Sequence, residues 1–203
     1  HFLLNATIIG GSIFVVFLGL IIIWVTTLKV PDFKSFDERR VSSSTKIYDK
    51  TGEIVLYDIH QDKKRTIIPI DQMGENIKEA TVAIEDETFY TNNGVSLRSI
   101  IRAILVNLRS GSYSQGGSTI TQQIVKNSLL TTDKAISRKI KEIFLALKVN
   151  KEMTKDEILE VYLNDAPYGG SIYGISEAAN SFFGKKPIDL TIAEAAYLAA
   201  IPQ

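Results

Sequence analysis

Three short clusters of charged and polar residues are the part of this 203-residue chain best suited to chemistry. The first holds the carboxylates Glu85, Asp86 and Glu87, which can give or take a proton. The second, residues 116–127, combines glycines with hydroxyl, amide and ammonium groups, and the third, residues 138–142, combines basic side chains with a carboxylate. Groups of this kind bind phosphate. Together the clusters predict acid–base chemistry on a phosphorylated substrate.

Glu85 is the candidate general base of the first cluster. A helix over residues 76–90 would place Glu85 and Phe89, which are four residues apart, on one side. A carboxylate beside an aromatic side chain suits proton transfer. The alternative is a solvated acidic helix end, and for the first cluster taken alone that alternative is favoured.

The second cluster predicts a stripe of polar side chains along one helix. If the helix starts at Ser118, Gln122 and Lys126 follow at four-residue steps, while Ile120 and Ile124 fall on another side. Free N–H groups at the helix start and the Lys126 ammonium suit phosphate. The spacing is not that of a P-loop, and Ser118 is predicted to be a cap or ligand contact because no histidine base accompanies it. Taken alone, the segment also fits an ordinary polar helix start.

The third cluster places Arg138 and Glu142 four residues apart on a predicted helix. A surface ion pair is the simplest interpretation, and it contributes only a few tenths of a kcal/mol. The functional interpretation is that the carboxylate holds a divalent metal or orients basic groups against a diphosphate.

Composition narrows the chemistry further. The chain has no cysteine, which excludes disulfides, zinc–thiolate sites and a cysteine nucleophile. His1 and His60 are the only histidines, so a histidine base or a multi-histidine metal site is not expected. With 23 basic and 23 acidic residues there is no net charge to attract nucleic acid, and no nucleic-acid partner is expected. Local clusters must therefore bind any anion.

The elements that position these clusters begin with a predicted membrane anchor at residues 1–30. No charged residue occurs from Ala6 to Thr27, and about 20 apolar residues in a helix span a bilayer core. Trp24 suits the headgroup interface, and the predicted membrane helix ends near the charged Lys29 and the helix-breaking Pro31. Residues 31–70 are predicted to form a linker and a β-hairpin, with strands at 46–49 and 53–57.

Residues 71–203 are predicted to form a helical domain. Apolar residues recur at three- to four-residue spacing over 76–90, 97–108, 118–129, 133–149, 154–163, 174–183 and 191–200. Thr154 with Glu157 forms a capping-box pattern, and Asp133 and Thr191 are predicted N-caps. The basic, amphipathic segment 97–108 would suit the bilayer surface, although core packing explains its apolar side equally well.

The clusters resemble the motifs of the peptidoglycan glycosyltransferase domain found in class A penicillin-binding proteins and monofunctional transglycosylases. Residues 85–94 resemble Glu-Asp-x-x-Phe-x-x-His-x-Gly, with Asn92 in place of the histidine. Residues 116–127 match Gly-x-Ser-Thr-Ile-Thr-Gln-Gln-x-x-Lys-Asn throughout, and residues 138–142 match Arg-Lys-x-x-Glu. Residues 155–164 are similar to the fourth motif, and Arg102 fits a family arginine. The resemblance covers residues 45–203.

This resemblance implies a mainly α, lysozyme-like glycosyltransferase domain with a small β-hairpin, preceded by one N-terminal transmembrane helix. It implies transfer of a glycan strand from undecaprenyl diphosphate to lipid II with inversion, and Glu85 as the base that deprotonates the acceptor 4-hydroxyl. Glu142 is implied as a second catalytic residue that positions Mg²⁺ or the diphosphate. The residues implied to bind substrate are Asp86, Phe89, Arg102, Ser118, Thr119, Gln122, Gln123, Lys126, Asn127, Arg138 and Lys139.

The implied partners are lipid II, the glycan strand on undecaprenyl diphosphate, the membrane and other cell-wall synthesis proteins. The implied location is the bacterial inner membrane, with a single pass and the catalytic domain outside the cytoplasm. The sequence ends at Gln203, before the fifth motif of the family, so the domain is expected to be truncated at its C-terminal end.

Two alternatives remain. A lytic murein hydrolase of the same lysozyme-like fold would use Glu85 as an acid and would need no phosphate-binding stripe. A membrane-anchored assembly module whose site has decayed would account for Asn92 and for the absence of the fifth motif.

Overall fold

The computed structural model describes residues 64–110, 116–129 and 135–202, the segments 45–51 and 55–59, and a few positions between 5 and 23. Most of the predicted membrane anchor at residues 1–30 lies outside these described residues. Within the described part of the chain, no helix combines the length and the apolar character needed to cross a bilayer.

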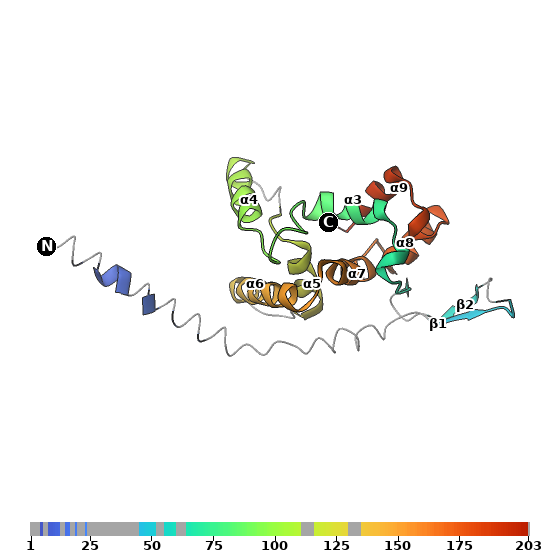
Figure 1. Ribbon diagram of the computed structural model, residues 1–203, viewed down its shortest axis with the longest axis horizontal. Helices are drawn as coiled ribbons and strands as arrows, with labels where there is room; N and C mark the ends of the chain where they lie inside the picture. The colour runs from blue at the N-terminus through green and yellow to red at the C-terminus, as the bar shows by residue number, and fades with distance from the viewer. Residues whose placement is uncertain are drawn as a thin grey trace.

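A β-hairpin comes first in the described part of the chain. Strands β1 (Thr45–Tyr48) and β2 (Val55–Ile59) pair antiparallel, and the register shifts by a bulge between Ile47 and Tyr48. Figure 1 shows the hairpin at one side of a helical body. The structure thus confirms the predicted hairpin, with each strand displaced by one or two residues.

The helical body confirms the predicted mainly α class (Figure 1). Its elements are η1 (Ile70–Gln72), α3 (Glu75–Glu85), α4 (Leu97–Ser110), α5 (Ile120–Leu129), α6 (Ala135–Glu152), α7 (Lys155–Asp165), α8 (Ile175–Phe183), η2 (Pro187–Asp189) and α9 (Ile192–Ala199). All seven predicted helices are present, although several ends differ. The predicted capping boxes at Thr154 and Thr191 are confirmed by side-chain hydrogen bonds in both directions. The predicted N-cap Asp133 lies outside the described residues.

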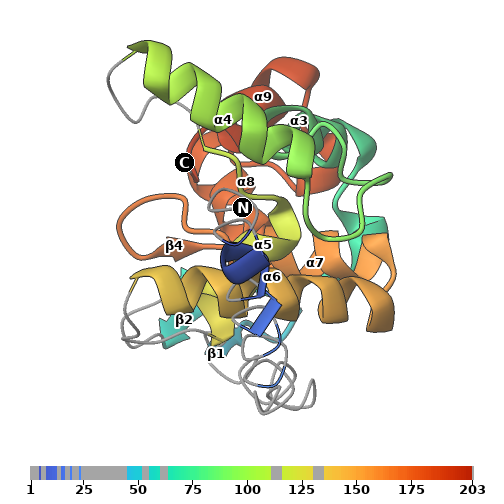
Figure 2. The ribbon, with the colours of Figure 1, turned by 90° about the vertical axis from the view of Figure 1, so that its left-hand side faces the viewer.

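Helix α5 lies at the centre of the body. Figure 2 shows α5 between α4 on one side and α6 on the other, and α5 also packs against α7 while α3 packs against α9. The core that these helices share is apolar and closed to solvent; it includes Ile77, Phe89, Ile120, Val125, Leu145, Val149, Ile158, Leu163 and Leu198. A central, buried α5 can hold side chains at fixed positions relative to its neighbours.

A short parallel strand pair, which the sequence did not predict, ties the segment before η1 to the body. Strand β3 (Lys64–Arg65) pairs with β4 (Ile172–Tyr173). The side chain of Asn164 on α7 then bonds both backbone groups of Ile68, accepting from its N–H at 3.0 Å and donating to its carbonyl at 2.8 Å. Residues 64–68, assigned to the linker and hairpin region from sequence, therefore contact the helical body directly.

Two helix boundaries near the site differ from the prediction. Helix α3 ends at Glu85 because Asp86 leaves the helical region, with φ −158° and ψ 80°. Phe89 therefore lies in the following turn and not four residues along the same helix, so the predicted pairing of Glu85 and Phe89 on one helix side is wrong. Helix α5 begins at Ile120, so Ser118 lies before it.

The two glycines that flank α8 give a matched test of backbone constraint. Gly184 has φ +64°, and an added methyl group there would meet nothing within 4 Å. Gly174 has φ +78° and ψ 150°, and an added methyl group would lie 2.7 Å from the Asn164 carbonyl oxygen. We expect Gly184→Ala to lower the free energy of unfolding by about 1 kcal/mol, from conformational strain alone. Gly174→Ala should lower it by about 3 kcal/mol or more, because strain and a backbone clash combine.

Urea denaturation of the two variants beside the wild type measures the difference. Equal losses of stability would show that the close approach of α8 to α7 at Asn164 is not a constraint on the fold.

Candidate active site

Glu85, the last residue of α3, is held by a side chain of α5. Its Oε2 accepts a hydrogen bond from Gln123 Nε2 at 2.5 Å, across 38 residues of sequence. Its other oxygen, Oε1, is closed to solvent and accepts no hydrogen bond within the part of the chain that the structure describes. One carboxylate oxygen is thus fixed by the protein, and the other keeps its lone pairs for a proton.

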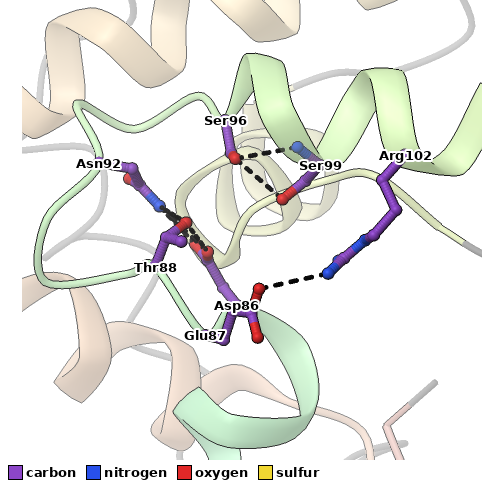
Figure 3. Close-up of polar contacts among 7 residues, drawn as sticks. All are labelled: Asp86, Glu87, Thr88, Asn92, Ser96, Ser99 and Arg102. Atoms are coloured by element: carbon purple, nitrogen blue, oxygen red, sulfur yellow. Dashed lines mark hydrogen bonds and ion pairs between the residues drawn. The ribbon is translucent and has the colours of Figure 1, made fainter.

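Asp86, the next residue, bonds to Asn92 and Thr88 in the turn after α3 (Figure 3), and it also bonds to the start of α5. Its buried carboxylate accepts two hydrogen bonds from Asn92 Nδ2, at 3.0 and 2.9 Å, and one from Thr88 Oγ1 at 3.1 Å. It also accepts from the backbone N–H of Ile120, the first residue of α5, at 3.4 Å. A negative charge at a helix start is favourable. Asp86 therefore supports the site from within the protein, and its buried carboxylate is not placed to contact substrate.

Asn92, which replaces the histidine of the motif, completes this arrangement. Its Oδ1 accepts from the Gly94 N–H at 2.9 Å and from Lys155 Nζ at 3.3 Å. The Lys155 ammonium also lies 4.7 Å from the centre of the Phe89 ring. Burial lowers the pKa of Lys155, and the negative charge of Asp86 opposes that shift. An amide can thus bridge a carboxylate and an ammonium here, because it offers a donor to one and an acceptor to the other.

Besides Asp86, three residues predicted to bind substrate are buried. Phe89 has no exposed surface and belongs to the core. Thr119 Oγ1 donates to the Gly94 carbonyl at 2.6 Å, and the fully buried Gln122 accepts from the Thr119 N–H at 3.1 Å through its side-chain oxygen. The predicted stripe of Ser118, Gln122 and Lys126 is therefore wrong at Gln122. Helix α5 packs against α6 and α7, and this packing, which the sequence pattern does not give, buries Gln122.

Instead of the predicted stripe, the side of α5 next to Glu85 carries Gln123, Lys126 and Asn127. Gln123 is half-buried against Glu85, while Lys126 and Asn127 are exposed. Positions 123, 126 and 127 are three and four residues apart, so they neighbour one another on a helix. An ammonium and an amide thus lie on the helix that also fixes the candidate base.

Helix α6 contributes a second group of polar side chains. Lys139 Nζ donates to Ser118 Oγ at 2.8 Å and forms an ion pair with the buried Glu142 carboxylate. Arg138, beside Lys139, is half-buried. The Ser118 hydroxyl before α5 and Lys139 of α6 therefore meet, and Glu142 pairs with Lys139 in place of the Arg138 considered from the sequence.

Glu142 does not fit a magnesium site in this arrangement. Its carboxylate is 3% exposed and is neutralised by Lys139. No group of three or more possible His, Cys, Asp or Glu ligands forms within the described ranges. Mg²⁺ takes oxygen ligands and keeps several of its waters. A magnesium ion bound by Glu142 therefore stays a prediction of the family resemblance.

Arg102 reaches the same region from α4. Figure 3 shows its guanidinium directed at Glu87, and Nη1 lies 3.3 Å from the Glu87 carboxylate. Both side chains are about half exposed, so the pair is a weak surface contact that an anion can replace. Gly117 lies close to the same helix, because an added methyl group would be 3.0 Å from the Ser99 carbonyl oxygen.

Sequence reasoning missed one residue of this region, Tyr162 on α7. Its hydroxyl lies 3.4 Å from Gln123 Oε1. Burial, then the negative charge of Glu85 and a side-chain hydrogen bond to Glu85, raise the pKa of the Tyr162 hydroxyl. The fourth motif contains Tyr162, but only the packing of α7 on α5 shows what it contacts.

Comparisons with known proteins agree with the motifs. The transglycosylase family model matches residues 52–203. The chain is 39% identical to penicillin-binding protein 1A of Aquifex aeolicus over 194 residues, which are 95% of this chain and 26% of that protein. It is 41% identical to penicillin-binding protein 1A/1B of Bacillus subtilis over 177 residues, 86% of this chain and 19% of that protein. It is also 39% identical to penicillin-binding protein 1A of Rickettsia bellii over 185 residues, 90% of this chain and 23% of that protein. The chain thus spans about a quarter of the length of these relatives.

Adjacent asparagines test the support that Asn92 gives to Asp86. We expect Asn92→Ala to lower the free energy of unfolding by about 2 kcal/mol, because the buried Asp86 carboxylate loses its two amide hydrogen bonds. Asn93→Ala is the matched control, since Asn93 is exposed and should change stability by less than about 0.5 kcal/mol. Chemical denaturation measures both. Equal effects at the two positions would contradict the role given to Asn92.

Proposed function

Because the chain belongs to the transglycosylase family, we propose that it is a peptidoglycan glycosyltransferase that polymerises lipid II into glycan strands. The mainly helical body with its small antiparallel hairpin fits the lysozyme-like fold of such a domain. The single observation that carries the proposal is the Glu85 carboxylate, with one oxygen held by Gln123 and the other without a protein partner within the described residues.

Glu85 is the base in this proposal. Substrate binding must open access to Glu85 Oε1, which is closed to solvent in this structure. The acceptor 4-hydroxyl then gives up its proton to the Glu85 carboxylate, while its oxygen forms a bond to the anomeric carbon of the donor. The bond from that carbon to the undecaprenyl diphosphate breaks, and the diphosphate leaves with the electron pair. Attack from the face opposite the leaving group inverts the anomeric configuration. A diphosphate is a stable anion, so its departure needs cationic stabilisation in place of a general acid.

The basic side chains around α5 are proposed to provide that stabilisation. Lys126 is exposed on the same side of α5 as Gln123, and Lys139 and Arg138 lie on the adjacent α6. Arg102 reaches the region from α4, where its weak contact with Glu87 can be exchanged for a phosphate oxygen. Asn127 and Ser118 add neutral hydrogen-bonding groups.

The membrane is the proposed setting, because a lipid-linked donor resides in a bilayer. Helix α4 supports this placement: Leu97, Ile101, Leu105 and Leu108 are each more than half exposed, and Arg98, Arg102 and Arg109 are exposed beside them. A basic helix with exposed apolar side chains binds the surface of an anionic bilayer. Together with the predicted anchor, it supports a single-pass protein of the bacterial inner membrane with its catalytic domain outside the cytoplasm.

Removal of the proposed base tests the chemistry. We expect Glu85→Gln to reduce polymer formation from lipid II by at least about 100-fold, the lower limit for loss of a general base. Gel analysis of the glycan strands made by the intact protein measures the effect. Wild-type yields of polymer from Glu85→Gln would refute Glu85 as the base.

Removal of Lys126 separates a polymerase from a lytic hydrolase. A hydrolase has no diphosphate to bind, so Lys126→Ala should reduce polymerisation by about 100-fold, yet would leave hydrolysis of polymeric peptidoglycan nearly intact. Lys186→Ala, at an exposed lysine before η2, is the matched control and should retain full activity. Release of soluble muropeptides by both variants, without polymer from the wild type, would instead establish the hydrolase.

A further inference from the structure

Three side chains from three helices meet at the proposed base. Tyr162 on α7 lies 3.4 Å from Gln123 Oε1 on α5, and Gln123 Nε2 lies 2.5 Å from Glu85 Oε2 at the end of α3. The residues are 39 and 38 positions apart in sequence, so tertiary packing alone brings them together. Gln123 is the link, because its amide has an acceptor at one end and a donor at the other.

The three positions differ in how firmly the fold holds them. Tyr162 is 5% exposed and belongs to the core. Gln123 and Glu85 are half-buried at the edge of that core. A buried aromatic ring has little freedom to move, whereas a glutamine side chain in solvent samples many rotamers. The core thus holds the Tyr162 hydroxyl in place, whereas the Glu85 carboxylate needs contacts that orient it.

The direction of the Gln123 amide decides whether it supports or opposes Glu85. With its NH₂ toward Glu85 it donates to the carboxylate, as the structure shows. Turned over, it would place its own carbonyl oxygen against the carboxylate. A hydroxyl donor at the other end favours the first orientation, because the tyrosine O–H needs the amide oxygen as its acceptor. The 3.4 Å separation is long for such a bond, but hydrogen bonds around catalytic groups often shorten once substrate binds.

We propose that Tyr162 is a positioning residue for the glycosyl transfer, which holds Glu85 both by direct contact and through Gln123. The proposal rests on the proposed function of Glu85 as the base. Tyr162 touches neither the donor nor the acceptor in this role. Its loss should therefore slow the chemical step and leave substrate binding unchanged.

The test is Tyr162→Phe in the intact protein, with labelled lipid II as substrate. This change keeps the ring that packs in the core and removes only the hydroxyl. We expect kcat to fall by about 5- to 20-fold, the loss of one to two modest hydrogen bonds, and KM to stay within about twofold. Tyr197→Phe is the matched control, because Tyr197 packs against Phe182 and Phe183 on α8 and should show wild-type kinetics.

A double-mutant cycle separates positioning from a general structural effect. In a Gln123→Ala background, Tyr162→Phe should reduce kcat by a smaller factor than in the wild-type background, because one of its two connections to Glu85 is already absent. Full additivity of the two changes would overturn the proposal. Unchanged kcat in Tyr162→Phe, or a rise in KM alone, would overturn it as well.

The positioning role and the proposed function fail in different ways. If the wild type makes polymer and Glu85→Gln does not, the function stands, and Tyr162→Phe tests positioning alone. If the wild type makes no polymer, the function itself fails and the positioning role fails with it. Matching circular dichroism spectra for the Tyr162→Phe and Tyr197→Phe variants establish that both are folded.

Discussion

The buried carboxylate of Asp86 is the interaction on which the rest of the site depends. Asp86 is only 6% exposed, and a charge taken out of water is costly unless hydrogen bonds replace its hydration. Asn92, Thr88 and the N–H of Ile120 provide those bonds. Asp86 follows the last residue of α3, and Ile120 is the first residue of α5, so the same carboxylate fixes the end of one helix against the start of the other. Glu85 and Gln123 meet as a consequence.

Burial divides the polar residues of the three motifs into two roles. One group is closed to solvent: Asp86, Thr119 and Gln122. Their side chains bond to backbone groups, as Thr119 does to the Gly94 carbonyl and Gln122 to the Thr119 N–H, so they fix the turn before α5. Lys126 and Arg102 remain exposed, and Gln123 is half-buried. The Nε2 atom of Gln122 is also buried but has no hydrogen-bond partner among the described residues, so these buried groups are not all satisfied. The polar segment 116–127 therefore holds both buried residues that fix the fold and exposed residues available to substrate.

Local patterns predicted most of the fold and only part of the site. Helix periodicity and the capping residues Thr154 and Thr191 depend on neighbours in sequence, and those predictions hold. The side of α5 that faces Glu85 was predicted incorrectly, because the packing of α5 against α6 and α7 decides which side is buried, and it buries Gln122 and turns Gln123 toward Glu85. Contacts across long stretches of sequence, such as β3 with β4, leave no periodic signal. The same holds for Tyr162, whose contact with Gln123 follows from packing of α7 on α5.

The central claim is that one protein carboxylate drives a single displacement at the anomeric carbon. The most direct measurement is the anomeric configuration of the linkage formed by the intact protein from lipid II, read from the one-bond and vicinal coupling constants in the NMR spectrum of the product. A base that activates the acceptor hydroxyl predicts inversion relative to the bond that joined the donor sugar to its diphosphate. Retention would contradict the account, because it would require a covalent intermediate on a second carboxylate.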